Sequence, residues 1–270
     1  MLRRTASSMA LLALLLPIAS PAPAQPQAQP LAEEVPFITT PDNVTLAMLQ
    51  LARVRPGDHV IDLGSGDGRI VITAARRFGA SGLGVEIVPD LVARSRTAAQ
   101  QAGVAAKVEF REQDLFKTDL SRASVITMYL LPEVNLQLRP ALLQLAPGTR
   151  IVSHDWDLGD WLPDETLTVD APDKTIGREK KSRLHRWVVP APVAGLWCGE
   201  GNLRWQISQQ YQIVQLRWQQ GPRGWTLPGR LDGTRLQLLG AAPGPLRWQV
   251  RGDELVAGTR RLRRGAGEAC

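Results

Sequence analysis

The amino-acid sequence predicts an α/β fold in which helices cover a mostly parallel sheet, followed by a small antiparallel all-β module. Three observations support this. Short aliphatic runs alternate with amphipathic stretches of helical length from about residue 59 to residue 153. A glycine-rich turn follows the first of these runs. Beyond residue 190 the pattern changes to period-two alternation, interrupted by Gly-Pro, Pro-Gly and Asp-Gly turns.

Residues 1–24 are predicted to form a secretory signal peptide. Two arginines precede an apolar run from Met9 to Ile18, and residues 22–24 supply the small side chains of a cleavage site. This run is too short to cross a bilayer as a helix. We therefore expect an exported protein, periplasmic or secreted, with an uncleaved membrane anchor as the alternative. Residues 25–35 are rich in proline and glutamine and predict an extended linker.

The α/β domain is expected over residues 36–190. It begins with a largely apolar helix between Pro41 and Val54, for which Thr40 is the predicted N-cap and Pro41 the first helical residue. A Pro-Gly turn then leads into a short buried strand that ends at Leu63.

The glycine-rich turn lies in the stretch H-V-I-D-L-G-S-G-D-G-R-I, from His59 to Ile70. Three glycines in five residues permit a tight turn and the close approach of a ligand to bare backbone. A helical pattern starts at Arg69, so the N–H groups and the positive dipole end of that helix face the same place. The predicted ligand contacts in this stretch are Asp62, Gly64, Ser65, Gly66 and Gly68.

The carboxylate of Asp62 indicates which kind of ligand suits this turn. A dinucleotide-binding fingerprint reads G-x-G-x-x-G, whereas the glycines here are spaced G-x-G-x-G behind an acid. A carboxylate at that place would repel a pyrophosphate, and it suits a ligand that carries an amine. The turn therefore favours a cationic nucleoside over a dinucleotide.

A second acid, Glu86, ends the strand predicted at Leu83–Ile87. It follows Gly64 by 22 residues, and an acid at the tip of the second strand commonly accepts hydrogen bonds from both hydroxyls of a ribose. Ile87 beside it is a further predicted contact. The alternative role of Glu86 is that of a solvated charge at a strand end.

A third acid, Asp114, comes after a helix predicted over 90–101 and a strand predicted over 107–110. At that place its carboxylate could meet the amino group of an adenine, with Leu115 offering an apolar contact. A turn aspartate over an apolar core is the alternative for this residue.

The fourth strand is predicted at Val125–Met128 and runs into the turn Tyr129-Leu130-Leu131-Pro132. The remaining elements are a helix over 136–145, a fifth strand over 150–153, and two antiparallel strands at about 166–169 and 184–189. Ligands of such sheets bind outside the carboxyl ends of the strands. Because Asp62, Glu86, Asp114 and Tyr129 all lie at strand ends, we expect them to share one cleft.

Residues 191–270 predict a small antiparallel β module, curled or barrel-like, in which Leu203–Trp218 and Arg235–Leu239 alternate with period two. It holds five of the eight tryptophans, for which core packing is favoured over a ligand pocket. It also holds eleven arginines, no lysine and five acids. An arginine-rich face of this kind either meets an anionic partner or keeps an exposed β surface soluble.

The chain has two cysteines, Cys198 and Cys270. An exported protein could pair them, but Cys270 is the last residue, where order is poor, so the sequence leaves their pairing open. Two cysteines and three scattered histidines lack the spacing of metal ligands, and we expect no metal site.

The turn D-L-G-S-G-D-G closely resembles motif I of the class I S-adenosylmethionine-dependent methyltransferases. From Pro36 to about Pro163 the chain resembles, more narrowly, the protein-lysine methyltransferase family whose mitochondrial members modify the ATP synthase c-subunit and the adenine nucleotide translocase. Further segments that carry this likeness are P-F-I-T-T-P, G-V-E-I-V-P-D-L-V, D-L-F, Y-L-L-P-E-V-N-L-Q-L-R-P and G-T-R-I-V-S-H-D. The resemblance implies a Rossmann-like, seven-stranded methyltransferase sheet with S-adenosylmethionine as the methyl donor.

The resemblance also implies roles for the predicted contacts. Asp62 and Gly64 would hold the amino acid end of the donor, Glu86 its ribose and Asp114 its adenine, with Thr40 also among the donor contacts. Tyr129 and Pro132 would place a lysine of a protein substrate, which is a membrane protein for the mitochondrial members. The alternative for Tyr129 is the role of a core or rim residue. The neutral lysine amine would attack the donor methyl group in line.

Two features depart from the family pattern, namely the apparent export signal and the Trp-rich carboxyl module. The protein substrate therefore does not carry over from the resemblance. One alternative is a methyltransferase acting on a small molecule or a nucleic acid. The chain lacks the Asn-Pro-Pro-aromatic motif of base-amine methylation after the fourth strand, which makes nucleic acid the weaker choice. The other alternative is an exported, non-catalytic binding protein that retains the cofactor fold.

Overall fold

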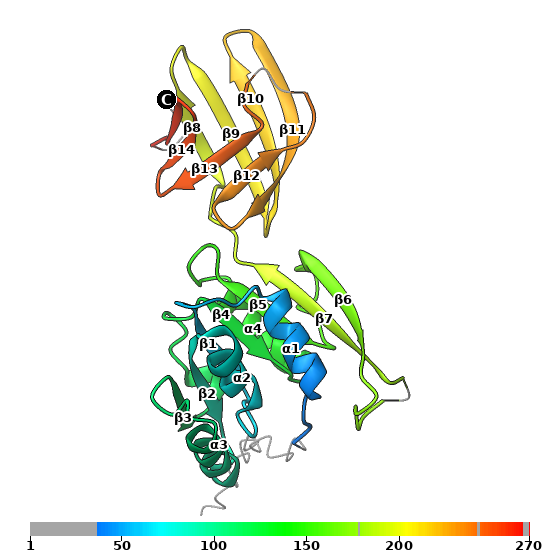
Figure 1. Ribbon diagram of the computed structural model, residues 1–270. Coiled ribbons are helices and arrows are strands. Elements are labelled where there is room, and N and C mark those ends of the chain that lie inside the picture. Colours follow the sequence, from blue (N-terminus) through cyan, green and yellow to red (C-terminus); the bar gives the residue numbers. More distant parts are fainter. Residues whose placement is uncertain (1–36, 178, 242–243, 267–269) are drawn as a thin grey trace, which may run out of the picture. The chain divides into compact units, whose positions relative to one another are not determined.

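The computed structural model describes residues 37–177, 179–241, 244–266 and 270 (Figure 1). The predicted signal peptide and linker lie outside the described residues. Within the described part of the chain, no helix is both long and apolar enough to cross a membrane. A helix-covered sheet and a β-barrel follow each other along the sequence.

The sheet has seven strands, six of which run in the same direction. They are β1 (His59–Leu63), β2 (Ser81–Glu86), β3 (Val108–Glu112), β4 (Val125–Met128), β5 (Arg150–His154), β6 (Glu165–Asp170) and β7 (Lys181–Val188). Their order in the sheet is β3-β2-β1-β4-β5-β7-β6, and β7 runs antiparallel to both of its neighbours. The order reverses between β1 and β4, and this switch point is where sheets of this kind bind ligands. The expected Rossmann-like class is confirmed.

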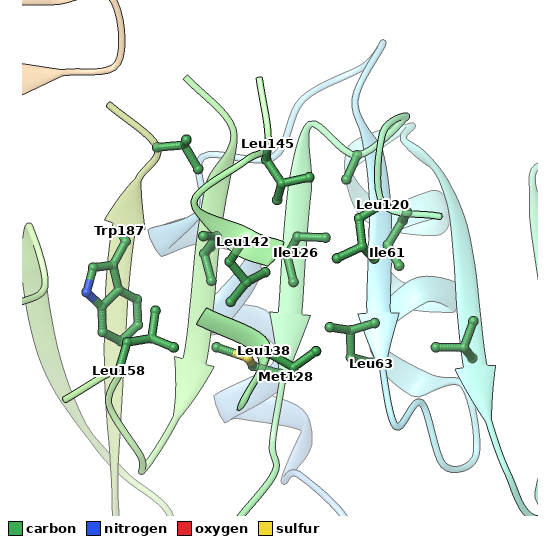
Figure 2. Packing of buried hydrophobic residues seen from close by; sticks show 14 of the residues in the cluster. Ile61, Leu63, Leu120, Ile126, Met128, Leu138, Leu142, Leu145, Leu158 and Trp187 are labelled. Atoms are coloured by element: carbon green, nitrogen blue, oxygen red, sulfur yellow. The ribbon is translucent and has the colours of Figure 1, made fainter. Parts of the chain in front are cut away.

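Each face of the sheet has its own apolar core, because successive side chains of a strand point to opposite faces. The helices are α1 (Asp42–Leu51), α2 (Arg69–Phe78), α3 (Pro89–Gln101) and α4 (Pro132–Leu142), with a 3-10 turn η1 (Leu115–Lys117). On one face, Ile61 and Ile126 pack with Leu138 of α4 (Figure 2). On the other face, Val60 and Val125 pack with α1 and α2. Burial on both faces explains why these strands are almost wholly aliphatic.

The start of α1 differs from the prediction. Pro41 has φ −56° and ψ 150°, an extended conformation, so the helix begins at Asp42 and Thr40 is not its N-cap. The Thr40 hydroxyl instead lies 3.3 Å from Nδ1 of His154. A tertiary contact thus engages the side chain that local capping rules assign to the helix.

The fourth helix also differs from its prediction, since it begins at Pro132 rather than at residue 136 and ends at Leu142 rather than at residue 145. Proline fits the first turn of a helix, where its missing N–H has no partner to lose. This first turn does not follow the apolar periodicity, because Asn135 in it is polar and buried. The Asn135 amide donates to the Ser153 hydroxyl (3.2 Å). Other boundaries of the domain move by one to three residues.

The carboxyl module is a closed, eight-stranded antiparallel barrel, so the expected β module is confirmed. Its strands are β8 (Gly195–Gly199), β9 (Leu203–Gln210), β10 (Ile213–Gln220), β11 (Arg223–Asp232), β12 (Arg235–Leu238), β13 (Arg247–Arg251), β14 (Glu254–Ala257) and β15 (Arg260–Arg264). The alternating run over 203–218 is not one strand. Tyr211, with φ 54°, forms the turn that divides it into β9 and β10.

The tryptophans of the barrel are mainly core residues. Trp197, Trp205, Trp218 and Trp248 are buried among its aliphatic side chains, which is the packing role that the sequence favours. Trp225 is different, because it is 40% exposed and lies edge-on to the ring of its cross-strand partner Trp218.

Cys198 of β8 and Cys270 form a disulfide, which answers the question that the sequence leaves open. The disulfide lies at the seam that closes the barrel. Among the described residues, β15 pairs with β8 at this seam through two residue pairs, Arg263 with Cys198 and Arg264 with Trp197. The covalent bond therefore reinforces the shortest strand pairing of the barrel.

Candidate active site

The polar residues predicted to bind ligands lie at the carboxyl edge of the parallel strands. The glycine-rich turn follows β1, Glu86 ends β2, Asp114 follows β3 and Tyr129 follows β4. A hydrogen bond joins the glycine-rich turn to Glu86, since the N–H of Gly66 donates to Oε2 of Glu86 (2.9 Å). These residues therefore lie at one edge of the sheet, on both sides of the switch point between β1 and β4, and the single cleft expected of them stays a prediction.

The turn needs its glycines. Gly64, Gly66 and Gly68 have φ of 73°, 53° and 78°, in the left-handed region that favours glycine. A Cβ atom on Gly66 would lie 2.1 Å from the ring of Phe37, and one on Gly68 would lie 2.7 Å from the ring of Phe110. Phe37 thus covers part of the turn, a contact that the sequence does not predict.

An arginine braces the turn against the segment before α1. The Arg69 guanidinium pairs with Asp67 (Nη2 to Oδ2, 2.6 Å) and donates to the carbonyl oxygen of Thr40 (2.8 Å). Ser65 is buried within the turn, and its hydroxyl has no hydrogen-bond partner among the described residues. The Thr40 carbonyl therefore helps to fix the turn through Arg69. The contacts with a methyl donor that the sequence predicts for Thr40 and Ser65 stay predictions.

Asp62 is a buried carboxyl group with little to compensate its charge. It is 2% exposed, and its Oδ1 accepts one hydrogen bond from a side chain, that of the Thr127 hydroxyl (2.6 Å). Burial raises the pKa of Asp62 to about 7, and the nearby charges of Asp67 and Glu86 act in the same direction. No cationic side chain pairs with it among the residues that the structure describes. A bound cation would favour its ionised form.

Backbone N–H groups hold the carboxylate of Glu86. Oε2 accepts from Gly66, and Oε1 accepts from the N–H groups of Ile87 (2.8 Å) and Val88 (3.1 Å), at the start of α3. Glu86 is therefore not the freely solvated charge of the alternative interpretation. Ile87 beside it is 69% exposed and offers an apolar surface at this edge.

Asp114 caps the turn η1, because its Oδ1 accepts the N–H of Phe116 (2.9 Å). This is the turn role that the sequence offers as its alternative. Leu115 packs partly against the main core, while Phe116 is half exposed. The adenine contact of Asp114 and Leu115 stays a prediction.

On the other side of the switch point, Tyr129 leaves β4 and packs on His154, the last residue of β5. The two rings stack with centroids 3.8 Å apart and 27° between planes. The Tyr129 hydroxyl donates to Oδ2 of Asp155 (3.2 Å). Burial raises the pKa of Tyr129 to about 12, and the charge of Asp155 adds to this, so its hydroxyl stays protonated at neutral pH. Pro132 follows as the first residue of α4.

Sequence reasoning misses three polar residues beside Tyr129, namely His154, Asp155 and Lys174. His154 is fully buried between the hydroxyls of Thr40 and Ser182, and burial lowers its pKa to about 4, so it is neutral. Lys174 extends from the β6–β7 connection to Asp155. The segment S-H-D after the fifth strand could have suggested the first two, but no local pattern marks Lys174.

Comparisons with known proteins agree with this geometry. A family described as "ANTKMT methyltransferase domain" matches residues 62–165. A protein-lysine N-methyltransferase of Saccharolobus islandicus is 41% identical over 138 residues, which cover 50% of this chain and 86% of that relative. This chain belongs to the protein-lysine N-methyltransferase family.

Other members of the lysine methyltransferase family show a similar likeness. The adenine nucleotide translocase lysine N-methyltransferase of Mus musculus is 38% identical over 136 residues, covering 50% of this chain and 58% of that protein. A human lysine N-methyltransferase named for the ATP synthase c-subunit is 34% identical over 155 residues, covering 54% and 66%. The family match ends at residue 165, ahead of the barrel.

A solved structure identifies the cofactor of the fold. A protein of Salinibacter ruber, described as an RNA methyltransferase in complex with S-adenosyl-L-homocysteine, is 50% identical with a TM-score of 0.53, covering 58% of this chain and 96% of that one. S-adenosylhomocysteine is what remains of S-adenosylmethionine after methyl transfer. S-adenosylmethionine is therefore the cofactor of this methyltransferase.

Proposed function

We propose that this methyltransferase transfers a methyl group from S-adenosylmethionine to the side-chain amine of a lysine in a protein. The observation that carries the proposal is the buried carboxyl group of Asp62, which lies beside a glycine turn at the switch point and has no cation of its own among the described residues. A donor with an ammonium group and a sulfonium group complements this site. The lysine acceptor is supported by the names of the relatives.

The residues at the carboxyl edge fit the donor. Asp62 and the backbone of Gly64 would hold its amino acid end, with the backbone of Ser65, Gly66 and Gly68 around it. Oε1 of Glu86 accepts two backbone N–H groups, whereas Oε2 accepts one and keeps a lone pair that can accept from a ribose hydroxyl.

Asp114, Leu115 and Ile87 would line the adenine. Thr40 would act indirectly, because its carbonyl oxygen holds Arg69 and its hydroxyl lies against His154. Pro132 would set the direction in which the chain leaves Tyr129, because it starts α4.

The donor supplies an electrophilic methyl group on a positively charged sulfur. The protein has to hold a neutral amine in line with it, which is a task of positioning and desolvation. Tyr129 suits this task because its hydroxyl stays protonated, so it orients an amine without removing its proton. The proton that the ammonium form loses passes to water.

A labelling experiment tests the acceptor. The purified protein is incubated with methyl-labelled donor and separate protein and RNA fractions, and the labelled molecules are then digested with protease or nuclease. We expect protease-sensitive label on lysine; nuclease-sensitive label would instead assign the activity in the name of the Salinibacter ruber protein to this chain.

The donor-binding roles are tested by titration with S-adenosylhomocysteine. We expect Asp62→Ala and Glu86→Ala each to weaken its binding by about tenfold or more. An affinity within about twofold of the wild type for both variants would contradict these roles.

We also propose that the chain is exported, either free or held by its amino terminus. The disulfide between Cys198 and Cys270 supports this, since such bonds persist mainly in oxidising compartments. Fractionation of cells that produce the native chain, with thiol labelling of each fraction, tests it. Recovery of reduced protein in the cytoplasmic fraction alone would contradict export.

A further inference from the structure

A buried lysine and a tyrosine hydroxyl meet on one carboxylate oxygen beside the active site. Nζ of Lys174 lies 2.6 Å from Oδ2 of Asp155, and the Tyr129 hydroxyl lies 3.2 Å from the same oxygen. The Lys174 side chain is only 10% exposed, and its Nζ also donates to the carbonyl oxygen of Lys181 (2.8 Å). One carboxylate oxygen thus accepts hydrogen bonds from both a primary ammonium group and a phenol hydroxyl.

The backbone fixes the carboxylate of Asp155 in place. Asp155 has φ 64°, in the left-handed region that non-glycine residues seldom adopt. Arg183 of β7 holds it there twice, because its carbonyl accepts the Asp155 N–H (2.6 Å) and its own N–H donates to Oδ1 (3.0 Å). These bonds engage Oδ1 and leave Oδ2 to the lysine and the tyrosine. Strained backbone of this kind often occurs at functional sites.

The surroundings suit an ammonium group. Tyr129 stacks on His154, which is neutral because burial lowers its pKa, and whose two ring nitrogens lie against hydroxyls. Asp155 therefore supplies the negative charge and the Tyr129 ring supplies an aromatic face. Carboxylates and aromatic faces are the groups that recognise alkylammonium ions in proteins.

The cluster lies at the same edge as the glycine turn. Tyr129 follows β4 and Asp155 follows β5, next to the switch point. The residue after Tyr129 touches the turn itself, since a Cβ atom on Gly64 would lie 2.9 Å from the side chain of Leu130. A lysine head group bound here would therefore approach the part of the site assigned to the donor.

We propose that Asp155 and Tyr129 form the binding site for the head group of the acceptor lysine, and that Lys174 fills this site in the free enzyme. The proposal rests on the lysine acceptor proposed above. The incoming lysine replaces Nζ of Lys174 on Oδ2 of Asp155 and then loses a proton to water. Its nitrogen forms a bond to the methyl carbon as the carbon–sulfur bond breaks, which leaves N-methyl-lysine and S-adenosylhomocysteine.

Exchange of one ammonium group for another explains why a buried lysine is tolerated here. The carboxylate of Asp155 keeps a cationic partner both in the free enzyme and in the complex with the ammonium form of the acceptor. Lys174 then competes with the acceptor. Its removal should strengthen acceptor binding, whereas removal of a purely structural ion pair would not.

A binding experiment tests the proposal without turnover. The full-length protein is saturated with S-adenosylhomocysteine and titrated with n-butylammonium chloride, followed by NMR. We expect Lys174→Met to bind the probe about tenfold more tightly than the wild type, and the double variant Lys174→Met/Asp155→Asn to lose this gain. Lys174→Gln, whose amide can still donate to Asp155, replaces Lys174→Met if the latter does not fold. Equal affinity of the single and double variants would overturn the proposal.

A kinetic experiment adds a readout that a structural role would not move. With a lysine-containing peptide as acceptor, Lys174→Met should lower KM about threefold or more at an unchanged kcat, and Asp155→Asn should raise KM about tenfold. Asp164→Asn is the matched control. Like Asp155, Asp164 binds a cationic side chain, that of Arg230 (2.6 Å), and accepts a backbone N–H, that of Val188 (2.7 Å). A KM shift of equal size in this control would contradict the subsite.

The two proposals can fail separately. If the wild type binds S-adenosylhomocysteine but methylates no lysine, the proposed acceptor is wrong, and the n-butylammonium titration still decides whether the ammonium site exists. If lysine is methylated while the probe affinities and KM values stay unchanged, only the assignment of Asp155 and Lys174 is wrong.

Discussion

Two buried aspartates, Asp58 and Asp62, flank the start and the end of β1, and their surroundings are opposite. Asp58 is 5% exposed and binds the Arg150 guanidinium (2.5 Å), the Ser124 hydroxyl and the N–H of Arg55. Burial would raise the pKa of Asp58, but these partners outweigh it and lower the pKa. Among the described residues, the Thr127 hydroxyl is the only side-chain donor to Asp62, and burial raises the pKa of Asp62 to about 7.

The difference separates a structural edge of the sheet from a functional one. At the amino edge the protein supplies the cation that a buried carboxylate needs, so Asp58 and Arg150 tie β1 to β5. At the carboxyl edge the described residues supply no cation for Asp62. The burial cost of Asp62 then remains in the free protein and can be relieved by a cationic ligand.

The largest expected effect is that of Asp58→Asn on stability. The substitution leaves the Arg150 guanidinium buried with no carboxylate, and we expect the free energy of unfolding to fall by about 3 kcal/mol. Urea denaturation followed by fluorescence measures this. Titration with S-adenosylhomocysteine is the control and should stay within about twofold of the wild type. A loss of ligand affinity in the folded variant would contradict the purely structural role of Asp58.

Asp62→Asn should act in the other direction. Asparagine keeps the hydrogen bond from Thr127 and removes the cost of a buried charge, so the unfolding free energy should be maintained or increase by about 1 kcal/mol. Affinity for S-adenosylhomocysteine should fall by about 10- to 100-fold, the usual loss for a charge-assisted hydrogen bond. Calorimetry gives both quantities, and a destabilised variant with full affinity would reverse the roles of the two aspartates.

The pH dependence follows from the pKa of Asp62, which is near 7 in the folded chain and near 3.8 for an ordinary aspartate. Because folding raises this pKa, protonation of Asp62 stabilises the folded protein. This stabilisation is fully present below about pH 3.8 and is lost as the pH rises through about 7. Ligand binding has the opposite sign, because it favours the ionised form. We expect affinity for S-adenosylhomocysteine to increase about tenfold from pH 6 to pH 8. Asp62→Asn should remove this dependence.

The smallest expected effect is that of Thr127→Val. It deletes the hydroxyl that stabilises ionised Asp62 while keeping a β-branched side chain in β4, so the pKa of Asp62 should rise further. We expect a loss of affinity of about fivefold at pH 7 and a shift of the affinity profile toward higher pH. An unshifted profile would mean that another group sets the pH dependence.

Local patterns predict much of the parallel sheet and part of the site. The aliphatic run before Gly64 and the acid at the end of the second strand place Asp62 and Glu86 correctly, because strand and turn preferences act over a few residues. They do not place Phe37 on Gly66, since that contact depends on a segment packed from outside the strand–turn–helix unit. Thr40 is mistaken for a cap for the same reason.

By itself, the sequence determined the order of strands and helices, the glycine turn with its preceding acid, and the change to a β module near residue 190. Periodicity and turn chemistry are written into neighbouring residues, so they can be read without a fold. Only the tertiary structure decided that Lys174 reaches Asp155, that Cys270 pairs with Cys198, and that Asp58 has a cation while Asp62 has none among the described residues. Each of these contacts joins side chains that are distant in the sequence, so it forms only when the sheet or the barrel folds.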